Sequence, residues 1–152
     1  MSDRLKALRL VIDEIGVPLS IDTVDDRLIL QKAVYLAQTK VTLGYNYGWY
    51  LKGPYSPKLT QDYYELADEI RRDQDLAGEL RQDAREALAS VRELISNAPD
   101  GVRKVSWLEL LASLHFLVRK SGFDLEAARR KIAETKPHLI PNVDAGAIAL
   151  QL

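Results

Sequence analysis

Apolar residues recur every three to four positions along most of the chain, which is the spacing of amphipathic helices. The first such stripe runs from Leu5 to Ile15, and Gly16 followed by Pro18 ends it. Residues 27–40 are apolar on several faces, which predicts a central helix that other elements surround. Further helices are predicted over residues 57–72, 76–95, 106–121, 124–135 and 142–152.

Three short polar signals predict helix starts. Ser56 followed by Pro57 places a hydroxyl at an N-cap and a proline in the first turn. The pattern from Ser106 to Glu109 is typical of a capping box, and Asp124 is the expected cap of the next helix. Residues 97–101 read as a loop.

One segment has a different period. Residues 47–51 are aromatic and alternate like a short strand, and Gly53 with Pro54 closes the segment. The pattern therefore predicts a mainly α protein. We expect one compact domain over residues 1–152, a bundle of six or seven helices with one short β-strand or turn element around residues 45–56.

Composition narrows the class of protein. The 152 residues are 47% hydrophobic and 28% charged, which is typical of a globular domain. There is no cysteine, so a disulfide framework and a thiolate metal site are excluded. No basic and apolar leader begins the chain, and no apolar run is long enough for a membrane span. We expect a cytoplasmic protein.

The sequence does not predict an enzyme. The two histidines, His115 and His138, lack the spacing of a metal site, and His115 reads as a core or boundary residue. The glycines at 44, 48 and 53 lack the Lys-Ser/Thr that completes a phosphate-binding loop. We therefore expect no catalytic residues, no metal and no cofactor.

The aromatic residues are concentrated in one region. All seven tyrosines lie between Tyr35 and Tyr64, whereas the aliphatic residues are spread over every predicted helix. Tyrosine combines a large apolar ring with a hydroxyl, which suits a recognition surface. A compact aromatic mini-core is the alternative, because ring area alone does not reveal exposure.

Nucleic-acid binding is a second hypothesis. A helix, a strand, a turn and a helix in succession are compatible with a winged-helix-like unit, with Lys52 near the turn. Arg129, Arg130 and Lys131 form a basic run that would contact phosphates. However, residues 61–100 carry eleven acidic and five basic side chains, and the net charge is −1. A solvated helix face is therefore the favoured explanation of the basic run.

Two motifs point to a family. Residues 30–36 read Leu-Gln-Lys-Ala-Val-Tyr-Leu, and Trp49 is followed by Gly-Pro-Tyr-Ser-Pro at residues 53–57. This pair resembles the Panacea antitoxin domain, to which the SocA-type antitoxins belong. It is still more similar to the related YwgA-type family of bacterial, archaeal and phage proteins. The resemblance covers about residues 25–70, and Tyr55, where many Panacea domains have an aliphatic residue, favours the YwgA-like branch.

The resemblance implies a mostly helical domain without catalytic machinery. Panacea domains neutralise diverse toxic proteins by direct contact and often belong to toxin–antitoxin or phage-defence loci. The implied partner is thus a protein, either a toxin or a defence effector, and a homodimer is compatible with the sequence. The motif residues that carry over are Leu30, Gln31, Lys32, Tyr35, Trp49, Gly53, Pro54, Ser56 and Pro57.

Two polar residues on the otherwise apolar central helix need partners. We expect the amide of Gln31 to bind the backbone of the turn at residues 53–56. We expect Lys32 to lay its stem along a tyrosine ring and to keep its ammonium at the rim of the protein. These residues either hold the turn in shape or support an interface formed by Trp49, Tyr50, Lys52 and Tyr55.

Overall fold

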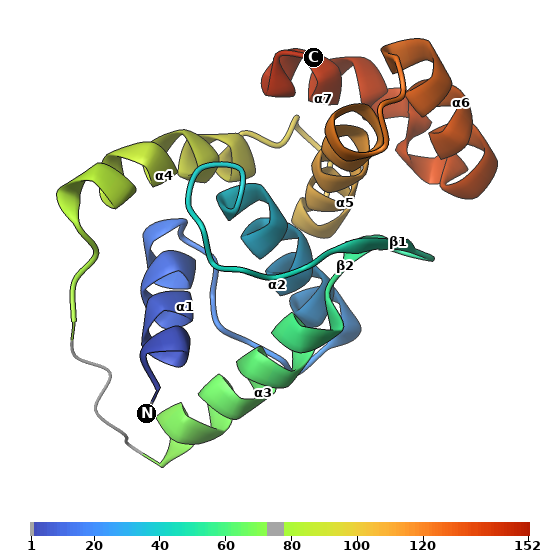
Figure 1. The fold of residues 1–152 in the computed structure, drawn as a ribbon. Helices are drawn as coiled ribbons and strands as arrows, with labels where there is room; N and C mark the ends of the chain where they lie inside the picture. Colours follow the sequence, from blue (N-terminus) through green and yellow to red (C-terminus); the bar gives the residue numbers. More distant parts are fainter. Residues whose placement is uncertain (1, 73–77) are drawn as a thin grey trace.

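The computed structural model describes residues 2–72 and 78–152, and within them the chain is mainly helical, as predicted (Figure 1). Its α-helices are α1 (Asp3–Glu14), α2 (Val24–Ala37), α3 (Pro57–Arg71), α4 (Gln82–Ser96), α5 (Lys104–His115), α6 (Leu125–Thr135) and α7 (Val143–Leu150). A π-helical turn, η1 (Phe116–Lys120), continues α5, and a 3₁₀ segment, η2 (Pro137–Asn142), precedes α7.

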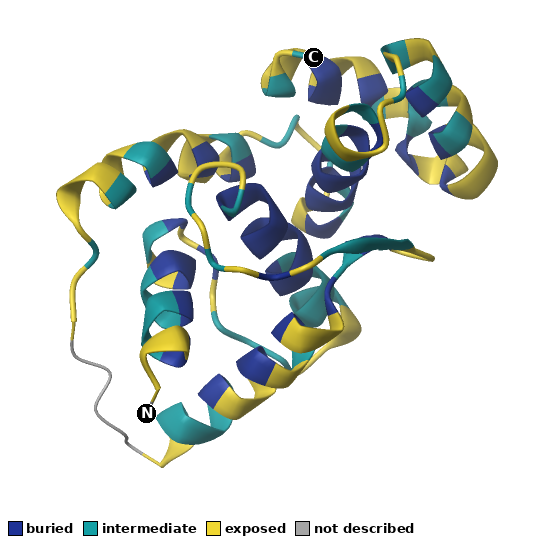
Figure 2. Ribbon diagram, in the orientation of Figure 1, coloured by how far each residue is buried: buried dark blue, intermediate teal, exposed yellow. Residues whose placement is uncertain are grey.

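Helices α2 and α5 form the centre of the fold. They pack against each other more extensively than any other described pair of elements. Every residue of α2 from Leu30 to Ala37 is buried, which confirms the predicted central helix (Figure 2). Helices α1, α3 and α4 pack on one side of this pair, whereas α6 and α7 pack against α5 (Figure 1).

Two of the predicted helix starts are confirmed and one is wrong. The Ser56 hydroxyl accepts a hydrogen bond from the Leu59 amide, and Pro57 is the first residue of α3. Asp124 caps α6 in the same way. Ser106, in contrast, lies inside α5, which begins at Lys104. An earlier start is needed to place Val105 in the helix, where it is buried.

The predicted start of the fourth helix is also wrong. Residues 73–77, including Leu76, lie outside the described residues, and residues 78–81 are not helical. Gly78 has a φ of +153°, a conformation that residues with a side chain rarely adopt, and α4 begins only at Gln82. Amphipathic periodicity therefore starts earlier in this segment than the helix itself.

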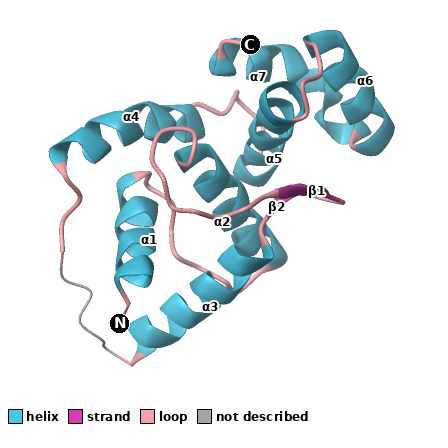
Figure 3. Cartoon of the chain, in the orientation of Figure 1, coloured by secondary structure: helices cyan, strands magenta, loops and turns pink. Residues whose placement is uncertain are grey.

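The predicted strand is one half of a β-hairpin. Strand β1 (Gly48–Tyr50) pairs antiparallel with β2 (Gly53–Tyr55), with Trp49 opposite Pro54. Sequence reasoning missed β2 because glycine and proline normally end strands. The connection from α2 to β1 runs as a loop across α2 before it enters the hairpin (Figure 3).

Within the described ranges, 2–72 and 78–152, no helix combines the length and the apolar character that crossing a membrane requires.

Candidate functional site

The base of the hairpin is attached to α2 by a buried glutamine. The Gln31 amide nitrogen donates to the carbonyl oxygen of Ser56 over 2.9 Å. The Gln31 amide oxygen accepts from the backbone N–H of Ser56, also over 2.9 Å. The expected contact between Gln31 and the turn is therefore confirmed. It satisfies both backbone groups of a residue that is wholly buried.

The lysine beside this glutamine is buried as well, so the expected rim position of its ammonium is wrong. Lys32 is only 1% exposed, and its Nζ donates to the carbonyl oxygen of Pro54 over 2.8 Å. Burial lowers the pKa of Lys32 to about 8, although the charge of Glu109 opposes this shift. The ammonium stays inside the protein because a strand carbonyl and a carboxylate both stabilise it.

A second buried lysine approaches the hairpin from α6. Lys136 follows the last residue of α6, and its Nζ donates to the carbonyl oxygen of Leu51. The same nitrogen lies 3.4 Å from Oε2 of Glu109 and 5.4 Å from the centre of the Trp49 ring. Sequence reasoning missed Lys136, because a lysine before a proline at a helix end carries no local sign of burial.

Glycine is required where the hairpin touches α5. The backbone of Gly53 has a φ of +94°, a conformation that side chains disfavour. A Cβ at this position would lie 2.8 Å from Oγ of Ser113, which is itself buried. The glycine of the motif therefore permits close contact between β2 and α5.

The aromatic cluster divides into a buried part and an exposed part, so both sequence interpretations apply. Tyr35, Tyr45 and Tyr63 are buried, whereas Tyr50 and Tyr64 are 48% and 45% exposed. Tyr47, Trp49 and Tyr55 are half-buried. The mini-core thus carries a smaller exposed aromatic surface at the hairpin.

The exposed part lies at the tip of the hairpin, where the chain turns between the strands. Leu51 is 85% exposed and Lys52 is exposed beside it. The ring of Tyr50 packs edge-on against Tyr55 with 5.2 Å between centroids. Of the predicted interface residues, Tyr50, Lys52 and Tyr55 therefore lie together at this end of the hairpin, whereas Trp49 does not. Leu51 is an additional apolar member that sequence reasoning missed.

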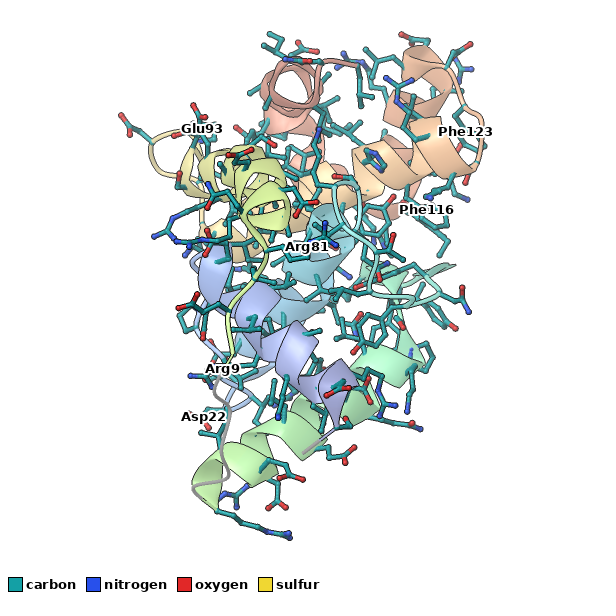
Figure 4. The ribbon with its side chains drawn as sticks, turned by 60° about the vertical axis from the view of Figure 1, so that its left-hand side comes forward. Arg9, Asp22, Arg81, Glu93, Phe116 and Phe123 are labelled. Atoms are coloured by element: carbon teal, nitrogen blue, oxygen red, sulfur yellow. The ribbon has the colours of Figure 1, made fainter. Side chains whose placement is uncertain are left out.

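Trp49 points to the supporting side of the hairpin. Its ring lies 5.9 Å from the ring of Phe116, the first residue of η1. Figure 4 shows Phe116 on the side of the molecule that carries the hairpin. Trp49 therefore links the strand to the core and shows only part of its ring to solvent.

The basic run of the nucleic-acid hypothesis lies on α6. Arg129 forms an ion pair with Asp144, and Nη1 of Arg130 lies 3.9 Å from Oε1 of Glu126. Lys131 is half-buried on the same helix. These carboxylates partly neutralise the run.

The two histidines contact different residues. Nδ1 of His115 lies 2.8 Å from the Tyr35 hydroxyl, and burial lowers the pKa of His115 to about 4. Nε2 of His138 lies 3.2 Å from Oε1 of Glu109. Over the described ranges, no group of three or more histidine, aspartate or glutamate side chains is arranged to hold a metal ion.

Comparison of the chain with protein-family models, with curated proteins and with solved structures found no match in any of the three searches.

Proposed function

We propose that this protein is a non-enzymatic interaction domain that binds a protein partner through the tip of its β-hairpin. The observation that carries the proposal is an exposed apolar tip on a firmly held hairpin. Tyr50 and Leu51 face solvent, while Gln31, Lys32 and Lys136 hold the backbone beneath them.

The rigidity of the hairpin favours binding. Ordering a loop on association costs free energy, and a hairpin already held in place avoids most of that cost. Tyrosine is enriched among the residues that dominate binding energy at interfaces, and exposed leucine adds apolar area. Tyr50 rests on Tyr55, so its ring is oriented before a partner arrives.

The partner class follows from the resemblance of the two motifs to Panacea domains. We infer that the partner is a toxin or a defence effector, which the domain neutralises by contact. Lys52 gives the tip a positive charge, so the partner surface is expected to carry carboxylates near it.

The test is an affinity purification of the tagged protein from its native host, with mass spectrometry of the eluate. We expect a stoichiometric protein partner that withstands nuclease treatment. Tyr50→Ala should weaken its capture by at least about tenfold, as expected for a hot-spot side chain, and Leu51→Ser should weaken it by a smaller factor. Both side chains are exposed, so the fold should be retained.

The matched control is Ile148→Ser, which also replaces an exposed apolar residue, 78% accessible on α7. Capture that is unchanged in both hairpin variants, or reduced equally in Ile148→Ser, contradicts the proposal. Loss of all co-purifying material on nuclease treatment would instead support the nucleic-acid hypothesis. Trp49 and Tyr55 are less suitable probes, because their half-buried rings also support the fold.

A further inference from the structure

A cavity of about 500 Å³ opens beside the base of the hairpin, in the size range of small-molecule sites. Helix α2, the α2–β1 connection and the junction of α5 with η1 all contribute to it. Its lining residues are Tyr35, Gln38, Thr39, Tyr45, Asn46, Tyr47, His115, Phe116 and Lys120.

The walls of this cavity are largely aromatic and held in place. The hydroxyl of Tyr45 donates to Asp62 over 2.7 Å, and that of Tyr47 donates to the carbonyl oxygen of Gln31 over 2.9 Å. The Tyr35 hydroxyl is occupied by His115. With these hydroxyls engaged, the tyrosines offer ring surface rather than hydrogen-bonding groups, and a planar apolar ligand suits such walls.

The loop wall is held just as firmly. The side chain of Gln38 donates to the carbonyl oxygen of Tyr45 over 3.0 Å and accepts from its N–H over 2.9 Å. This pair of hydrogen bonds fixes the α2–β1 connection against α2. The cavity is thus preformed and does not depend on a ligand for its shape.

The side chains that line the cavity carry positive charge but no negative charge. Among its nine residues there is no aspartate or glutamate, and the exposed Lys120 is the one permanently charged side chain. His115 is neutral at physiological pH because burial lowers its pKa to about 4. Phe116 and Lys120 are the first and last residues of η1, so this π-helical turn supplies both a ring and a cation to the cavity. Such turns are frequent at functional sites.

We infer that this cavity binds a small planar aromatic anion, with its ring against Tyr47 and Phe116 and its anionic group at Lys120. Nucleoside monophosphates and aromatic carboxylates share this chemistry. The inference stands apart from the hairpin interface, because it needs neither Tyr50 nor Leu51.

The test is isothermal titration calorimetry of the purified protein with two anions and their neutral counterparts. The probes are adenosine 5′-monophosphate against adenosine, and indole-3-carboxylate against indole-3-carboxamide. We expect one anion to bind at least about tenfold more tightly than its neutral counterpart, because Lys120 makes a charge-assisted contact only with the anion. The anion that binds shows whether the natural ligand is a nucleoside monophosphate or an aromatic carboxylate.

Two variants locate the binding. Lys120→Gln should weaken binding of the anion by about tenfold and bring it close to that of the neutral probe. Lys104→Gln, the same substitution at the exposed start of α5, should leave it unchanged. Absence of saturable binding for both anions overturns the inference. Equal binding of the anion by wild type and Lys120→Gln, or equal binding of anion and neutral probe, also overturns it.

Discussion

The ammonium of Lys32 donates a hydrogen bond of 2.8 Å to the carbonyl oxygen of Pro54, and this contact joins the central helix α2 to the hairpin. Next to it, Gln31 binds both backbone groups of Ser56. Two neighbouring residues of α2 therefore bind two neighbouring parts of the chain. Lys32 binds strand β2, and Gln31 binds Ser56, the residue that caps α3. The first sequence motif, residues 30–36, thus holds the second, residues 53–57, in place through the hydrogen bonds of Gln31 and Lys32, which we call the clamp.

The burial of Lys32 predicts an unusual dependence of stability on pH. Its pKa is lowered, chiefly by burial, from 10.5 to about 8, so between these values the unfolded state binds more protons than the folded state. The free energy of unfolding should therefore rise with pH, by about 1 kcal/mol from about pH 8 to about pH 9. Urea unfolding at a series of pH values measures it.

The window ends near about pH 9, because above it the ionisation of tyrosines in the unfolded state opposes the rise. Burial raises the pKa of Tyr35 and Tyr45, so above that point the folded state holds more protons. Lys32→Met should remove most of the rise, with a smaller part remaining from Lys136, whose pKa burial also lowers. A flat wild-type profile, or an equally steep one in Lys32→Met, is incompatible with this account.

Replacement of the clamping glutamine should destabilise the whole domain. Gln31→Leu leaves the N–H of Ser56 buried without its partner and removes one of two hydrogen bonds to its carbonyl, which keeps the one from the Thr60 amide. We expect a cost of about 2 kcal/mol in the free energy of unfolding. Chemical denaturation measures the change. Gln61→Leu, on the exposed face of α3, is the control and should change stability by less than about 0.5 kcal/mol. A similarly small effect of Gln31→Leu would show that the turn keeps its shape without the clamp.

The close approach of β2 to α5 makes Gly53 intolerant of a side chain. Gly53→Ala should cost about 3 kcal/mol, because backbone strain at a φ of +94° adds to a contact of 2.8 Å with Ser113 Oγ. Gly122→Ala is the matched control. It has a φ of +78° with no atom within 4 Å, so only the strain of about 1 kcal/mol remains.

A double-mutant cycle separates the two contributions to the cost of Gly53→Ala. Adding Ser113→Ala removes the hydroxyl that the new Cβ meets. We therefore expect the combined variant to recover about 1 kcal/mol or more relative to the sum of the single changes. Additive effects would assign the whole cost to backbone strain.

A buried carboxylate of α3 joins this helix to α1 and to the α2–β1 connection. Asp62 is 0% exposed, accepts from the Tyr45 hydroxyl over 2.7 Å, and pairs with Arg4 over 2.9 Å and with Lys58 over 3.4 Å. Burial alone would raise its pKa, but the hydrogen bonds from Tyr45 and Arg4 and the charge of Arg4 outweigh burial and lower it. The carboxylate is therefore charged in the folded state, and it stabilises the fold.

Asp62→Asn should lower the free energy of unfolding by about 2 kcal/mol at neutral pH, since one charge-assisted hydrogen-bond network is lost. The difference from wild type should shrink as the pH falls below 3.8, the ordinary pKa, because the Asp62 carboxyl then binds a proton in the unfolded state at a higher pH than in the folded state. Thermal unfolding at several pH values measures both effects. Asp83→Asn is the control, because the Asp83 carboxylate is exposed, and it should hardly change the free energy of unfolding. An equal decrease in the two variants would contradict the role of Asp62.

The sequence by itself determined the helical class of the fold and the position of most elements. Periodicity and caps are local, so the stripe of α1, the cap at Ser56 and the cap at Asp124 could be read directly. The contact of Gln31 with the turn was also predictable, because a polar residue on an apolar helix needs a partner. The pairing of β1 with β2 was not, since its strand residues include a glycine and a proline.

The tertiary structure alone decided which polar and aromatic residues are buried. Lys136 meets the hairpin across 85 positions of sequence, and Tyr35 meets His115 across 80 positions. No local pattern encodes such contacts, because they arise only when α5 is packed beside α2 and α6 is packed against α5. The same packing exposes Leu51, buries Asp62 among the apolar residues on the inner face of α3, and forms the cavity. Local sequence specifies elements, whereas burial depends on every element that packs against a residue.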